Sequence, residues 1–262
     1  MVTGAYGKPK PDFREELERI LHILDQPEHS DIMMRVIGAL AFNLHCPRFN
    51  YIQGALGRKF TDIDFVAYST YTKRIIELLS SLGYEEDVAV TRFFGEQRLV
   101  FHDRENDRHI DVFFNELKFC HRIPFRGRLE VDKPTIPLAE LLLEKLQIVK
   151  INEKDIIDSI MLLREHPLGR TDEETINVNI IGALCSSDWG WWRTVTRNSA
   201  IIRENLESYS QLTDEDRVAV ASQLDGLMKY LDEEPKSLRW RLRSLIGERV
   251  KWYEEVEELA NR

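Results

Sequence analysis

Residues 57–68 read GRKFTDIDFVAY, a strand-like run with two acidic residues at its centre. Asp62 and Asp64 alternate with apolar residues, and successive strand residues point to opposite faces of a sheet. The two carboxylates therefore share one face, while Ile63 and Phe65 share the other. Burying two neighbouring carboxylates unpaired costs on the order of several kcal/mol each. The pattern predicts either a divalent cation at this face or a strand whose polar face meets water.

Two helical segments flank this run at a distance. Residues 31–46 (DIMMRVIGALAFNLHC) predict an amphipathic helix with Gly38 and Ala39 in its interior. An interior Gly costs about 1 kcal/mol unless another group must approach the backbone closely. Residues 137–150 (PLAELLLEKLQIVK) predict a second helix with Lys145 beside its apolar stripe. Both helices are therefore candidates to border the acidic face.

A third acid lies on a later strand-like run. Residues 108–114 (RHIDVFF) carry Asp111 among apolar and β-branched neighbours. The polar sequence DREND separates this run from residues 98–102, which is typical of a β-hairpin. The hairpin is expected to set Asp111 beside Asp62 and Asp64.

The signals occur in a fixed order: a hydrophobic residue with Gly38 and Ala39, then Arg58, Thr61, Asp62 and Asp64, then Asp111, and finally Lys145 before a KDxxD helix. This order, over residues 32–163, resembles the DNA polymerase β-type nucleotidyltransferase superfamily. The later lysine and the KDxxD helix most resemble its AbiEii-type group, which includes toxins of abortive-infection systems. The chain has Ala39 where that superfamily usually has Gly or Ser.

The resemblance implies an enzyme that moves a nucleoside monophosphate from an NTP to a hydroxyl acceptor by a two-metal mechanism. Asp62, Asp64 and Asp111 would be the catalytic metal ligands, and Asp111 would help to deprotonate the acceptor. Hard oxygen ligands without a Cys or His cluster suit Mg²⁺ or Mn²⁺. The residues that would bind the nucleotide are Gly38, Ala39, Arg58, Thr61, Lys145 and Asp155.

Several alternatives stay open. The acceptor is a small molecule, RNA or protein; an AbiEii-like toxin would modify tRNA and have an antitoxin protein as partner. A catalytically silent protein that keeps the fold and only binds its ligand is a further alternative. Lys145 and Asp155 also have plainer interpretations, as a lysine that reaches water and as a surface helix acid.

Composition limits the class of protein. With 262 residues, 43% hydrophobic and 31% charged, the chain is typical of a globular protein. A net charge of −9 argues against broad adhesion to nucleic acid, although a basic stretch occurs at Lys118, His121, Arg122, Arg126 and Arg128. No apolar run approaches the roughly 20 residues of a membrane span. Together with three scattered cysteines, this predicts a cytoplasmic protein without membrane contact.

The expected fold is α+β. A nucleotidyltransferase domain at 1–135, with a small mixed sheet flanked by helices, precedes an all-helical domain at 136–262. Strands are expected around Asp62 and Asp64 and at 87–94, 98–102 and 109–114, and residues 47–58 are expected to form a loop. Helices are expected at 12–24, 31–45, 70–82, 138–150, 153–165, 172–186, 189–206, 213–231 and 237–260.

Overall fold

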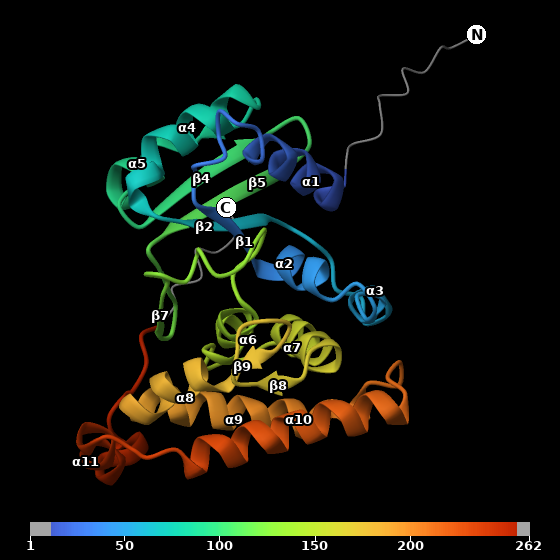
Figure 1. Cartoon of the computed structure of the whole chain (residues 1–262), viewed down its shortest axis with the longest axis vertical. Helices are drawn as coiled ribbons and strands as arrows, with labels where there is room; N and C mark the ends of the chain where they lie inside the picture. The colour runs from blue at the N-terminus through green and yellow to red at the C-terminus, as the bar shows by residue number, and fades with distance from the viewer. Residues whose placement is uncertain (1–11, 256–262) are drawn as a thin grey trace.

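The computed structural model describes residues 12–255 and has an α+β fold with a small mixed sheet, as predicted (Figure 1). The sheet has five strands: β1 (Met34–Ile37), β2 (Ile63–Ala67), β3 (Glu85–Glu86), β4 (Arg98–Asp103) and β5 (Arg108–Phe114). Their spatial order is β1-β2-β5-β4-β3. Strands β2 and β5 run parallel, and the other neighbours are antiparallel. The predicted hairpin of residues 98–114 is therefore confirmed.

One face of the sheet is apolar. Ile63, Phe65, Ile110 and Val112 point to this face and are fully buried. Helices α1 (Phe13–Leu24) and α4 (Thr72–Ser81) lie on this side, and α5 (Val88–Phe94) packs beside β4 (Figure 1). Asp12 caps α1, because its carboxylate accepts the Glu15 backbone N–H at 2.7 Å.

The other side of the sheet meets the helical half of the chain. Helix α2 (Gly38–His45) packs against β1 and β2 and also against α6 and α7, so the apolar core continues from the sheet into the helices. The remaining helices are α3 (Tyr51–Ala55), α6 (Leu138–Leu146), α7 (Glu153–Glu165), α8 (Val178–Ser187), α9 (Trp189–Asn205), α10 (Asp214–Glu233) and α11 (Leu238–Ile246). Short 3₁₀ turns occur at Ser69–Tyr71, Leu206–Ser208 and Gly247–Arg249. The boundary between residues 135 and 136 stays a prediction.

The second half also contains extended segments, so the expectation of an all-helical second half was wrong in part. A parallel pair of two-residue strands, β8 (Leu168–Gly169) and β9 (Ile176–Asn177), precedes α8. A further hairpin, of β6 (Glu116–Lys118) and β7 (Arg122–Pro124), lies in the first half and precedes α6. Because β9 takes its place, the helix expected from residue 172 begins only at Val178.

The helix predicted for residues 31–45 was wrong in its first half. Met34–Ile37 forms strand β1, all four residues of which are buried, and α2 begins only at Gly38. This short run is apolar at every position but Arg35, so it has no regular alternation to separate strand from helix, and pairing with β2 decides in favour of a strand. Gly38 has φ +71°, a conformation that turns the chain from the strand into the helix.

Three further local predictions were wrong. Residues 87–94 were expected to form a strand, but Val88–Phe94 is helix α5, and the Asp87 carboxylate caps it by accepting the Val90 N–H at 3.0 Å. Residues 47–58, expected as a loop, contain helix α3. The last helix was expected to reach residue 260, but α11 ends at Ile246 before Gly247 with φ +60°. Residues from 256 onward lie outside the described part of the chain.

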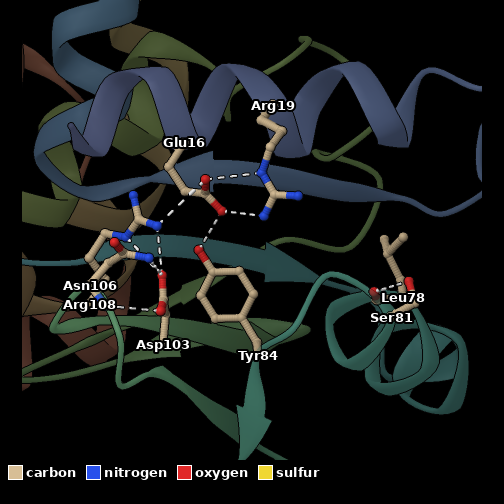
Figure 2. Close-up of polar contacts among 8 residues, drawn as sticks. All are labelled: Glu16, Arg19, Leu78, Ser81, Tyr84, Asp103, Asn106 and Arg108. Atoms are coloured by element: carbon tan, nitrogen blue, oxygen red, sulfur yellow. Dashed lines mark hydrogen bonds and ion pairs between the residues drawn. The ribbon is translucent and has the colours of Figure 1, made fainter. Parts of the chain in front are cut away.

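An ionic network on the apolar face ties α1 to the sheet (Figure 2). Glu16 of α1 accepts hydrogen bonds from Arg19 at 2.6 Å and from the Tyr84 hydroxyl at 2.8 Å. Arg108 of β5 lies 3.6 Å from Glu16 and donates to Asp103 of β4 at 2.6 Å. Each of the two carboxylates therefore has a guanidinium partner.

Candidate functional site

The three predicted carboxylates lie on the face of the sheet opposite this network. Asp64 and Asp111 are register partners on the parallel strands β2 and β5, so the predicted placement of Asp111 is confirmed. Asp62 directly precedes β2. The His109 Nε2 atom is 3.9 Å from Asp62 Oδ2 and 4.0 Å from Asp111 Oδ2, which places the imidazole between the two acids. The role of the three acids as metal ligands stays a prediction.

The Asp64 side chain stands out because its carboxylate makes no hydrogen bond or ion pair with any residue between 12 and 255. Burial raises the pKa of the Asp64 carboxyl well above its ordinary value, and the charges of Asp62, Asp111 and Glu144 raise it further. Lys145 acts in the opposite direction but does not reverse the shift. The negative charge around Asp64 therefore outweighs the positive charge that Lys145 supplies.

Gly38 brings backbone directly against Asp64. Ile37 pairs with Asp64 across the sheet, and a Cβ atom added to Gly38 would lie 2.4 Å from Asp64 Oδ2. The positive φ and this close approach both restrict the position to glycine. The Gly38 N–H donates to Glu144 Oε2 at 3.1 Å, so the start of α2 is fixed to α6. The predicted close approach at Gly38 is thus present, at the first residue of the helix.

Lys145 lies in a buried cluster beside this position. Its Nζ atom is 2.9 Å from Glu144 Oε1 and 3.5 Å from Asp158 Oδ2. Asp158 also accepts a hydrogen bond from Gln53 Nε2 at 2.9 Å and lies 3.4 Å from Arg58 Nε. Burial lowers the pKa of Lys145, but Glu144 and Asp158 more than offset this and hold it above its ordinary value. Lys145 is therefore a charged lysine that the protein itself neutralises.

Arg98 of β4 binds Asp111 with both arms of its guanidinium group. Nε donates to Oδ1 at 3.0 Å and Nη2 donates to Oδ2 at 2.7 Å, a bidentate pair. The guanidinium also lies 5.2 Å from the centre of the Phe113 ring. Both carboxylate oxygens of Asp111 are thus engaged by an arginine whose side chain is partly exposed.

Two of the three carboxylates, those of Asp62 and Asp64, suit a hard divalent cation, whereas the carboxylate of Asp111 is bound by Arg98. Asp62 and Asp64 offer carboxylate oxygens, and Asp64 has no competing partner within the described chain, which fits Mg²⁺ or Mn²⁺. Within residues 12–255, however, no group of three or more His, Cys, Asp or Glu side chains is arranged to hold a metal ion. Asp111 would become available as a third ligand only if Arg98 moved away from it.

The other residues predicted to bind nucleotide have structural contacts or are exposed. The Ala39 carbonyl accepts a hydrogen bond from Gln53 at 3.2 Å, and Thr61 is exposed just before β2. Asp155 forms a capping box with Asn152 at the start of α7. Burial raises the pKa of Asp155, although Lys145 opposes this shift. In the described chain, none of these three residues makes a side-chain hydrogen bond or ion pair with the Asp64 carboxylate.

The basic stretch does not form an open cationic surface. His121 is buried, and burial lowers its pKa to about 4. Arg128 is bound by Glu140 and Asp172. Lys118 and Arg122 both contact Glu254, at 3.1 and 3.7 Å, whereas Arg126 is exposed and has no ion pair with a described residue. Acids therefore oppose three of the five basic residues, and RNA binding by this stretch stays a prediction.

Sequence patterns did not identify Arg98, Glu144 or His109 as parts of the site. His109 could have been found from the period of a strand, because it lies two residues before Asp111 and shares its face. Glu144 had a weaker signal: it precedes Lys145 in a helix whose nine residues are all buried. Arg98 becomes visible only through the pairing of β4 with β5, which sets it opposite Phe113.

Neither a scan of protein-family models nor a search of curated proteins gives a match to this chain. In the described part of the chain, no helix is both long and apolar enough to cross a lipid bilayer.

Proposed function

We propose that this chain is a metal-dependent nucleotidyltransferase that moves a nucleoside monophosphate from an NTP to a hydroxyl group. The observation that carries the proposal is the crowding of Asp62, Asp64 and Asp111 on one face of the sheet, with no cationic partner for Asp64 in the described chain. Crowded, desolvated carboxylates are costly unless a ligand of opposite charge completes the site. A resident pair of Mg²⁺ or Mn²⁺ ions would supply that charge and stabilise negative charge on the phosphoryl oxygens during transfer.

The chain's own residues would orient the reactants. Asp62 and Asp64 lie at the edge where β1 turns into α2, so a nucleotide phosphate near them would meet the backbone at Gly38. Asp111 would accept the proton of the acceptor hydroxyl once Arg98 has left it. Lys145 and Arg58 are both paired with Asp158, so their contact with phosphate requires competition with that acid.

A binding protein without catalysis is the second candidate, and one observation favours it. Arg98 holds both oxygens of Asp111, which is the arrangement expected of a site that is neutralised permanently by its own chain. The labelling experiment below tests whether the acceptor is a small molecule, RNA or protein. If the chain is an AbiEii-like toxin that modifies tRNA, it would also have an antitoxin protein as its partner.

The first experiment measures NTP binding by calorimetry with Mn²⁺, with Mg²⁺ and with EDTA. We expect binding that depends on the metal and is lost in the double variant Asp62→Asn with Asp64→Asn. Asp107→Asn is the matched control, because Asp107 is an exposed acid with φ +54° in the hairpin turn, where Asn is well tolerated. Unchanged metal-dependent binding in the double variant would refute the proposed site.

The second experiment measures transfer of label from each α-labelled NTP to total RNA, total protein and a small-metabolite extract, offered separately. We expect one pool to be labelled, and the rate to fall at least about a hundredfold in Asp64→Asn, because loss of a catalytic cation removes several kcal/mol of transition-state stabilisation. Metal-dependent NTP binding without label in any pool would favour the silent binding protein.

A further inference from the structure

Helix α11 carries an apolar stripe that no described residue covers. Leu238, Leu242 and Leu245 are 72%, 58% and 79% exposed, and Ile246 is also exposed. Their spacing of four, three and one residues places them on one side of a helix. None of the nine residues of α11 is buried. Contiguous exposed apolar side chains of this kind mark an interaction surface.

The opposite side of α11 is fixed to the body of the protein. The Trp240 ring packs edge-on against Trp192 of α9, with ring centres 5.3 Å apart. Ser237 caps the helix by accepting the Trp240 N–H at 3.1 Å, and its own N–H donates to the Ser186 carbonyl at 2.9 Å. The stripe therefore points outward from a helix that is already folded and anchored.

Arginines border the stripe on both sides. At 100° per residue, Arg241 lies on one side of the leucines and Arg239 on the other. Neither guanidinium has a hydrogen bond or ion pair with a described residue. Residues 238–251 contain five basic residues and one acid, a local charge of +4 in a chain whose net charge is −9. A partner that fits this surface must therefore carry negative charge beside apolar groups.

A cavity of about 950 Å³ adjoins the stripe. Leu242 and Ile246 line it from α11, and the rings of Trp189, Trp240 and Trp252 line it from three segments of the chain. Arg243 closes one wall, because its guanidinium lies 4.8 Å from the centre of the Trp189 ring and donates to the Gly247 and Val250 carbonyls, each at 2.6 Å. The cavity is large enough to accept a bulky side chain.

We propose that α11 and this cavity form the docking surface for a partner protein that presents an acidic amphipathic helix. Apolar side chains at i, i+4 and i+7 of the partner would pack on Leu238, Leu242 and Leu245, as in other helix-in-groove complexes. One large apolar side chain would enter the cavity, and flanking carboxylates would face Arg239 and Arg241. The proposal is independent of nucleotide transfer, since its test needs neither NTP nor metal.

Two other occupants fit less well. An anionic membrane would meet the leucines and arginines, but a lipid surface presents no side chain to fill the concave cavity. Nucleic acid would pair with the arginines, but phosphates leave the leucines without apolar contact. A helix with apolar and acidic positions satisfies the stripe, the arginines and the cavity together.

The test uses the full chain and a synthetic, dye-labelled helical peptide of about 16 residues, long enough to extend beyond α11. The peptide carries Leu and Phe at i, i+4 and i+7 and Glu at most other positions; a second peptide replaces each Glu with Lys. Fluorescence anisotropy is expected to show salt-sensitive binding of the Glu peptide and binding at least about tenfold weaker for the Lys peptide.

Two double variants probe the surface. Leu242→Asp with Leu245→Asp, and Arg239→Glu with Arg241→Glu, are each expected to weaken binding of the Glu peptide at least about tenfold. Val218→Asp is the matched control, because Val218 is 70% exposed on α10, away from α11, and should leave affinity unchanged. All substituted side chains are largely exposed, and circular dichroism checks that the variants fold.

Four results would overturn the proposal. The first is a wild-type protein that fails to bind the Glu peptide or binds the Lys peptide equally well. The second is binding that both double variants retain. The third is sedimentation with phosphatidylserine–phosphatidylcholine vesicles that is lost in Leu242→Asp with Leu245→Asp, which would assign the surface to a membrane. The fourth is a dimer, seen by light scattering, that this same variant dissociates, which would assign it to a second copy of the chain.

Discussion

Strand β5 supplies charged residues to two sites on opposite faces of one sheet, and the two sites balance their charges differently. On the apolar face, Arg108 joins a network with Glu16 and Asp103 in which each acid has a guanidinium partner (Figure 2). On the other face, Asp111 neighbours Asp64, which has no such partner in the described chain. The same strand thus serves one closed structural network and one open acidic site.

The pKa values of the acids express this difference. Burial alone would raise the pKa of Glu16, but hydrogen bonds from Arg19 and Tyr84 lower it below its ordinary value. Asp103 behaves alike, because hydrogen bonds from Arg108 and Asn106 outweigh its burial. At Asp64, burial and neighbouring acids raise the pKa together. Ionisation therefore stabilises the fold at the network and destabilises it at the site, which is the physical reason to expect a ligand at the site.

The largest effect is expected when the network is broken. Arg108→Ala leaves Glu16 and Asp103 buried with fewer partners, and we expect a loss of about 3–5 kcal/mol in the free energy of unfolding. Arg104→Ala is the control, because Arg104 is a neighbouring arginine, 76% exposed, that pairs with Glu85 at 2.5 Å. An exposed pair contributes at most about 1 kcal/mol. Urea denaturation measures both, and equal losses in the two variants would show that the network does not stabilise the fold.

A gain in stability is expected when the unbalanced acid is removed. The pKa of Asp64 is higher in the folded than in the unfolded chain, so the folded state binds more protons between the two values. Stability therefore falls as pH rises through that window and stays reduced above it. In EDTA at pH 7, Asp64→Asn should unfold at a higher urea concentration than wild type, and this difference should vanish below pH 4.

Glu16 gives the opposite sign and serves as the control. Its pKa is lowered in the folded chain, so its contribution is present above the unfolded value and is lost as pH falls through the folded one. Glu16→Gln should therefore lose stability at pH 7. If Asp64→Asn is less stable than wild type at pH 7, Asp64 has a structural partner and the contrast between the two faces disappears.

How far the sequence predicted this arrangement depends on the range of the interactions involved. The alternation of Asp62, Ile63, Asp64 and Phe65 is local, and it predicted the two faces of β2 correctly. The DREND turn is also local, and it predicted the β4–β5 hairpin. The parallel pairing of β2 with β5, which sets Asp64 beside Asp111, is not local, and the expectation that these acids meet rested on the hairpin and on the family resemblance.

The errors have the same origin. Met34–Ile37 is apolar at every position but one, so local pattern could not separate a strand from a helix until pairing with β2 was known. The ion pair between Arg98 and Asp111 depends on the register of β4 against β5. Glu144 reaches Gly38 across 106 positions in the chain. Side chains brought in by tertiary contacts decide the charge balance of the site, and sequence patterns do not report them.

The smallest effect is expected at Arg98, and it separates an active site from a silent one. If Asp111 is a metal ligand, Arg98 competes with the cation for both of its oxygens. A partly exposed ion pair contributes about 1 kcal/mol, so Arg98→Gln should strengthen Mn²⁺ binding about five- to tenfold. Calorimetry with Mn²⁺ measures this, with Arg104→Gln as the control for loss of one positive charge.

The variant Asp111→Asn tests whether the effect passes through Asp111. In that background Arg98→Gln should leave Mn²⁺ affinity unchanged, because residue 111 then has no carboxylate for which Arg98 and the cation compete. An equal gain in both backgrounds would mean that Arg98 acts only through its charge at a distance. A loss of affinity in Arg98→Gln would mean instead that the arginine holds Asp111 in the orientation the cation needs. Wild-type protein that binds no Mn²⁺ at all would leave Arg98 as the permanent counter-ion of Asp111, and the two faces of the sheet would then differ only in the unpaired carboxylate of Asp64.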